Sequence, residues 1–206
     1  MELSKKERRE LKREGRQEEL RVIAKRAKIK VFGILAVFLI ILAAGLYFGY
    51  QYISKKASIG EMGSSFPIEG DKHVSDGTKV EYRTNPPTSG DHYGVPANWG
   101  VYDHEIPDEA AVHNLEHGGV WITYKPEIAE TIKAKLIEIT KSNSKVIMTP
   151  RAKNDAPIAL VSWGRIYKPE ISAEGAFDES GVSDFILKYK NTGPEKVPDS
   201  MPGKDY

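Results

Sequence analysis

The pattern of apolar and polar positions divides this chain into one long apolar run and a mixed remainder. Residues 31–53 (VFGILAVFLIILAAGLYFGYQYI) contain no charged side chain. At a helical rise of about 1.5 Å per residue such a run spans the hydrocarbon core of a bilayer, so it predicts a transmembrane helix. The run ends among tyrosines suited to the membrane interface and lacks a small-residue cleavage site, which favours a signal-anchor over a cleaved signal peptide.

Charge on the two sides of this run predicts its orientation. Residues 1–30 carry 12 Lys or Arg against 6 Glu, whereas the whole chain has a net charge of only +1, so the part beyond the run is acidic. A basic flank stays in the cytoplasm. We therefore expect a basic cytoplasmic arm (1–30) and a single-pass cell-membrane protein with its C-terminal part extracytoplasmic. Its partner is the lipid bilayer, and an acidic outer part excludes nucleic acid.

The remainder changes character several times along the chain. Residues 54–72 are rich in Gly and Ser and predict a flexible stalk. Residues 84–108 contain repeated Pro and Gly and no sustained period, which predicts a long irregular loop, and its aromatic residues indicate that the loop is ordered. The folded domain is expected from about residue 73, and residues 197–206 are expected to form a loose polar tail.

Regular periods follow this loop and predict a short helix and then elements in the order β-α-β-β-α. The first expected element is a short helix, capped by Asp108 and ended by Gly118 and Gly119. The apolar and β-branched patterns then predict strands at 120–124, 145–149 and 158–163, and helices over about 126–139 and 182–189. The order favours an α+β fold: a two-layer domain in which helices cover one face of a small mixed sheet.

Candidate chemistry is concentrated in the histidines. All five lie between positions 73 and 117, and His113 and His117 flank Glu116 at helical spacing, which places all three on one side of a helix. The chain has no cysteine, so a transition-metal site would use imidazole and carboxylate, a set suited to zinc or copper(II). His92 is the preferred third ligand and His73 the next, while Glu116 either ligates or orients an imidazole.

Two alternatives to a metal-binding module remain open at this stage. Inverted zinc peptidases use a His-x-x-Glu-His helix, with the glutamate as general base and a downstream glutamate as third ligand. Glu116 would be the catalytic base here, and Glu195 lies at a comparable distance downstream, although Gly118 and Gly119 end the helix early. The other alternative is a structural or interaction module whose buried histidines form hydrogen bonds without a metal.

Four blocks of sequence resemble a known family. They are residues 85–93 (NPPTSGDHY), 112–120 (VHNLEHGGV), 162–165 (SWGR) and 191–195 (NTGPE). In this order they are similar to the bacterial domain of unknown function 3105, over residues 73–196. The resemblance implies a membrane-anchored or exported domain with these limits. It implies no activity, so the chemistry rests on the histidine pattern.

Overall fold

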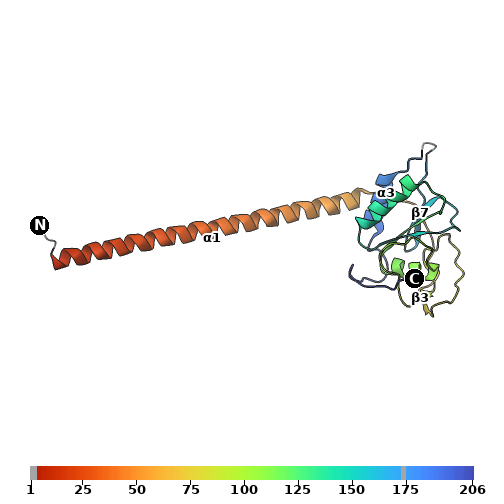
Figure 1. Ribbon diagram of the computed structural model, residues 1–206, viewed down its shortest axis with the longest axis horizontal. Helices are drawn as coiled ribbons and strands as arrows, with labels where there is room; N and C mark the ends of the chain where they lie inside the picture. Colours follow the sequence, from red (N-terminus) through yellow and green to blue (C-terminus); the bar gives the residue numbers. More distant parts are fainter. Residues whose placement is uncertain (1–3, 173–174) are drawn as a thin grey trace. The chain divides into compact units, whose positions relative to one another are not determined.

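The computed structural model describes residues 4–172 and 175–206, and the chain forms two compact units, Met1–Lys55 and Lys56–Tyr206. Most of the first unit is helix α1 (Lys5–Ser58) (Figure 1). Among the described residues, α1 is the one helix long and apolar enough to cross a membrane. This property fits a single-pass anchor or a signal sequence.

The second unit is built on a six-stranded mixed sheet with the strand order β1-β8-β7-β5-β6-β4. Strand β5 pairs in parallel with β6 and antiparallel with β7, β4 and β6 are parallel, and β8 is antiparallel to both β7 and β1. The apolar strand expected at 158–163 is therefore interior, as its composition indicates. The strands are β1 (Ser64–Ser65), β4 (Gly100–Val101), β5 (Val120–Tyr124), β6 (Val146–Pro150), β7 (Ile158–Ser162) and β8 (Arg165–Tyr167).

Both faces of this sheet are covered. Along β5, Val120, Ile122 and Tyr124 face helices α3 (Glu130–Lys141) and α4 (Glu179–Tyr189), whereas Trp121 faces α2 (Asp108–Glu116) and the irregular segment before it. The α+β class and the mixed sheet are confirmed. The expectation that helices cover one face needs correction, because α2 packs on the opposite face and adds a third layer.

The helix starts also differ in detail from the sequence pattern. Asp108 does not cap α2: the N-cap is Pro107, without a side-chain cap, and the Asp108 carboxylate instead accepts two hydrogen bonds from Arg151. Helix α3 begins at Glu130 and α4 at Glu179. The early start of α4 follows from Asp178, whose side chain accepts from Gly181 N–H at 2.8 Å.

The segment expected to be a flexible stalk is attached to the domain over much of its length. Strand β1 pairs with β8, Met62 N–H donates to Tyr189 Oη at 2.9 Å, and Glu61 pairs with Arg165 at 2.7 Å. The edge strand β8 presents unpaired backbone donors and acceptors, and Ser64 and Ser65 pair with them. The structure therefore corrects the stalk prediction for residues 61–72.

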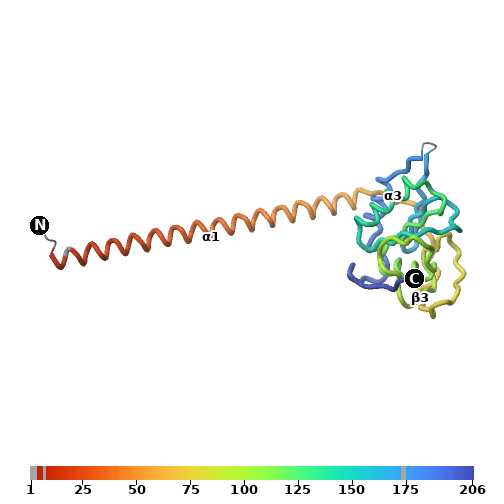
Figure 2. Tube along the Cα trace, viewed as in Figure 1, coloured from red at the N-terminus to blue at the C-terminus, as the bar shows by residue number. Residues whose placement is uncertain are grey.

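The polar tail is also held by the domain. Lys204 N–H donates to Pro96 O at 2.9 Å, and the ring of Tyr206 lies 6.0 Å from that of Tyr93. In Figure 2 the C-terminal end accordingly reaches the region of β3 (His92–Tyr93). The expectation of a loose tail does not hold, because backbone pairing and an aromatic contact anchor residues 203–206.

Candidate metal centre

Helix α2 carries the His113–His117 motif in a fully buried position between the sheet and the irregular segment. All nine of its residues are buried. The Asn114 side chain donates to Ala97 O and accepts from Ala97 N–H, both at 2.8 Å, and Leu115 on the next position packs in the core. The preceding segment is thereby fixed against the helix, and His113 and His117 are directed to a defined place.

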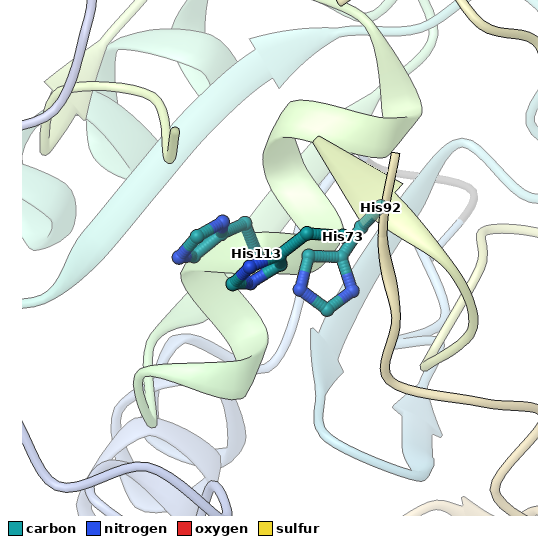
Figure 3. A group of neighbouring side chains, drawn as sticks. All are labelled: His73, His92 and His113. Carbon is teal, nitrogen blue, oxygen red and sulfur yellow. The ribbon is translucent and has the colours of Figure 1, made fainter. Parts of the chain in front are cut away.

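A second, two-stranded sheet brings two distant histidines to the same place. Strands β2 (His73–Val74) and β3 pair in parallel, and the register sets His73 directly against His92. Figure 3 shows these two rings beside that of His113. The ring centroids are 5.0 Å apart for His73–His92, 4.9 Å for His73–His113 and 5.0 Å for His92–His113. His92 is fully buried, while half of the His73 side chain is exposed.

Two carboxylates complete the cluster. Glu116 Oε2 lies 3.0 Å from His92 Nε2 and 3.6 Å from His73 Nε2. His113 Nε2 and His117 Nε2 are 3.0 Å apart, and Glu195 Oε2 lies 3.2 Å from His117 Nε2. Four imidazoles and two carboxylates thus direct nitrogen and oxygen atoms that can bind a metal ion toward one small region.

The outward nitrogens of two rings are held by backbone carbonyls. His113 Nδ1 donates to Tyr93 O at 2.6 Å and His92 Nδ1 donates to Gly90 O at 2.8 Å, since a carbonyl can only accept. A neutral ring that donates from Nδ1 keeps its lone pair on Nε2, the atom that faces the cluster. Among the described residues His117 Nδ1 has no hydrogen-bond partner, so its tautomer is not fixed from outside.

Burial keeps the helix histidines neutral. It lowers the pKa of His113 to about 4, despite the hydrogen bond to Tyr93, and the neighbouring histidines act in the same direction as burial. Burial also lowers the pKa of His117, against the opposing charges of Glu195 and Glu116. At neutral pH both rings are therefore unprotonated at one nitrogen, which is the form that binds metal ions.

Glu195 is the member of the cluster that the sequence pattern did not select as a ligand. The segment around it pairs with the end of α2: Asn191 N–H donates to Gly118 O at 2.8 Å and Glu195 N–H to Glu116 O at 3.1 Å. Gly193 between them has no room for a side chain, because a Cβ there would lie 2.3 Å from Glu116 O. The only sequence signal was the analogy with a downstream peptidase glutamate.

Four further side chains with metal-binding, nucleophilic or charged groups lie elsewhere in the domain. His104 bonds to Asp103 and to the Tyr206 carbonyl oxygen, away from the other four histidines. Met148 is a fully buried core residue, and the Ser89 hydroxyl accepts from Glu69 N–H. Arg165 pairs with Glu61 rather than facing the cluster.

The described residues contain two overlapping groups that could hold a metal ion. One consists of His73, His92 and His113, and the other of His113, Glu116 and His117. Within each group the ligand atoms lie within 4.8 Å of one another. Four of these five residues are buried, and His113 is common to both groups. The geometry therefore brings the five candidate ligands together as two groups of three that share His113.

Among the comparisons with known proteins, a family model matches the chain. No curated protein and no solved structure matches it. The family model described as "Protein of unknown function (DUF3105)" matches residues 73–201, more than half of the chain and the part that contains every cluster residue. The chain therefore belongs to the DUF3105 family.

Proposed function

We propose that this protein is a membrane-anchored, extracytoplasmic domain that binds a transition-metal ion, zinc or copper(II). The ligands are His113, His117 and His92, with Glu116 and His73 beside them. Nitrogen-rich sites with a carboxylate suit zinc and copper(II) better than calcium or magnesium, which prefer oxygen ligands alone. Glu195 is positioned to add an oxygen ligand next to His117.

The contact between His92 and Glu116 carries the proposal. His92 donates its Nδ1–H to Gly90 O, and its Nε2 faces the Glu116 carboxylate at 3.0 Å. Two acceptors at this distance repel each other unless a proton or a cation lies between them. His113 Nε2 directs a further lone pair into the same region. A divalent cation satisfies all of these groups together.

Glu116 is better placed to support the metal than to act as a general base. A base for hydrolysis must reach the metal-bound water and remain free to take its proton. Glu116 Oε2 lies 3.0 Å from His92 Nε2 and 3.6 Å from His73 Nε2, so a cation held by these rings would also take this oxygen as a ligand. We therefore propose a binding module, and treat metal-dependent hydrolysis as the competing function.

Metal content tests the site directly. The full chain, purified in detergent, stripped with a chelator and reloaded with zinc or copper(II), is expected to retain about one equivalent by elemental analysis. His113→Ala and His117→Ala should lose most of it, and bound metal should raise the melting temperature only where it binds. The matched control is His104→Ala, which removes a histidine outside the cluster. Unchanged metal content in both helix variants would overturn the proposal.

The two candidate functions are separated by Glu116→Gln. The amide keeps the shape of the side chain but cannot take a proton. If Glu116 supports the site, this change weakens metal binding and the wild type hydrolyses neither peptide nor ester substrates. Metal-dependent hydrolysis that is lost in Glu116→Gln, with metal content retained, would instead establish the hydrolase.

Membrane topology is tested separately with protease added to intact protoplasts. The charge asymmetry around residues 31–53 leads us to expect digestion of the domain from residue 56 onward and protection of the arm. Full protection of the domain would reverse the orientation.

A further inference from the structure

A polar cleft of about 650 Å³ lies away from the histidine cluster. Its walls include Tyr82, Pro87 and Ile106, and its charged groups come from the segment before α2, from the start of α2 and from the residues after β6. Its volume falls in the range of small-molecule sites, which combine apolar walls with a few directed polar groups. A ligand could bind only to those polar groups that have no partner within the protein.

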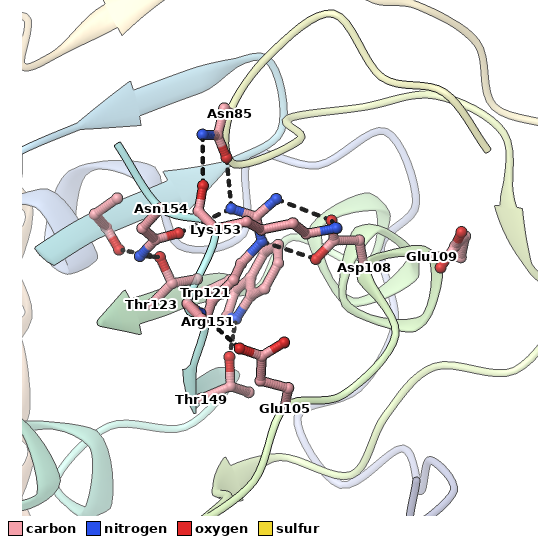
Figure 4. Close-up of polar contacts among 12 residues, drawn as sticks. Asn85, Glu105, Asp108, Glu109, Trp121, Thr123, Thr149, Arg151, Lys153 and Asn154 are labelled. Carbon is pink, nitrogen blue, oxygen red and sulfur yellow. Dashed lines mark hydrogen bonds and ion pairs between the residues drawn. The ribbon is translucent and has the colours of Figure 1, made fainter. Parts of the chain in front are cut away.

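Most of the charge around the cleft is balanced internally (Figure 4). Arg151 donates to both oxygens of Asp108, at 2.9 and 3.0 Å, and its remaining donors reach Asn85 and Asn154. Lys153 pairs with the same Asp108 carboxylate at 2.7 Å. This network binds the segment after β6 to the start of α2, and its partners are already satisfied.

Glu109 is a buried carboxylate of the cleft that this network does not include. It is 3 % exposed, and its Oε1 accepts from Val80 N–H at 3.1 Å. Its Oε2 has no hydrogen-bond partner among the described residues. The nearest cation, Lys79 Nζ, stands at 3.9 Å on a side chain that is 77 % exposed. A buried carboxylate oxygen without a donor is costly, so its presence at the wall of a cleft indicates a ligand that supplies the donor.

The surroundings of Glu109 favour a positive ligand. Burial and then the negative charges of Glu109, Asp108 and Asp91 raise the pKa of Tyr82, which lines the same cleft. The phenol is therefore neutral and adds no charge of its own. Because Asp108 is already neutralised by Arg151 and Lys153, Glu109 is the buried carboxylate of the cleft, among the described residues, whose second oxygen still lacks a hydrogen-bond donor.

We propose that the cleft binds the primary ammonium group of a small organic molecule through Glu109 Oε2. A guanidinium prefers both oxygens of a carboxylate, and here one is held by Val80, whereas an ammonium acts as a point charge that needs only one. Lys79 Nζ stands 3.9 Å from the same oxygen and covers it, so displacement of this lysine would open the oxygen to another ammonium. The exposed lysine then acts as a weak internal competitor that the ligand displaces.

Calorimetric titration of the full chain in detergent, in an amine-free buffer, tests the assignment. The probe is n-butylammonium, and the neutral control is n-butanol. Only the ammonium is expected to bind saturably. Glu109→Gln should weaken binding by about tenfold or more, which is the size expected for one hydrogen bond to a charged group. Lys79→Met should strengthen it severalfold, because the competitor is removed.

Three results would overturn the proposal: no saturable binding of n-butylammonium, equal binding of n-butanol, or unchanged affinity in Glu109→Gln. If Glu109→Gln does not fold, as judged by circular dichroism, Lys79→Met decides on its own. This variant changes an exposed side chain, and unchanged or weaker binding there would contradict the role assigned to Glu109 Oε2.

Discussion

Lys145 offers the sharpest test of how the domain holds its candidate site together. The side chain is 2 % exposed, and its ammonium donates to three acceptors: His117 O at 3.2 Å, Asn191 Oδ1 at 2.8 Å and Val197 O at 2.6 Å. Asp199 lies 3.7 Å away. One cation thus connects the end of α2 to the segment that carries Glu195. Lys145→Met keeps the length of the side chain and removes its charge.

Two effects of this change oppose each other. Each hydrogen bond from a charged donor contributes about 1.5–3 kcal/mol, so losing three costs roughly 4.5–9 kcal/mol, and the buried His117 O is left without this donor. Removing a buried charge recovers several kcal/mol of desolvation. Because His117 O stays buried, while the acceptors of Asn191 and Val197 are partly buried, we expect the loss to exceed the gain, with a net destabilisation of about 3–5 kcal/mol.

Urea unfolding of residues 56–206, followed by tryptophan fluorescence, measures this difference. These residues contain both hydrophobic clusters of the domain. The control is Lys141→Met at an exposed helix position, where the free energy of unfolding should change by less than about 0.5 kcal/mol. A change below about 1 kcal/mol in Lys145→Met would refute the reasoning, because relief of desolvation would then equal the lost hydrogen bonds.

Two further predictions concern the start and the end of α2. Burial raises the pKa of Asp108, but Arg151 and a neighbouring lysine outweigh it and hold that pKa below its usual value. This stabilisation is complete above about pH 4 and is lost as the pH falls through the lowered pKa, so melting curves of Asp108→Asn should show reduced stability at pH 7 and a flatter acid limb. Gly119→Ala would place a Cβ 2.6 Å from Trp99 and should cost about 1–3 kcal/mol in the same unfolding assay, whereas Gly94→Ala, with its nearest atom at 3.9 Å, should cost little.

The local elements were predictable because their signals are local. The β-branched and aromatic composition of 120–124 and the steps of three and four in the helix before residue 141 belong to each segment by itself, and the structure has a strand and a helix there. The short strands β1 and β2 were not predictable. They are two residues long and owe their geometry to a partner far along the chain, not to their own composition.

The sequence by itself determined the long apolar helix, the α+β class and the pairing of His113 with Glu116 and His117, because helical spacing puts these three on one side. Only the tertiary structure decided which distant residues lie beside these three side chains. The register of β2 with β3 sets His73 beside His92. The two hydrogen bonds between the Asn114 side chain and the Ala97 backbone hold the segment after β3 against α2. The backbone bonds of residues 191–195 bring Glu195 to His117. Such contacts depend on strand pairing and close backbone approach between distant segments, which no periodicity within one segment encodes.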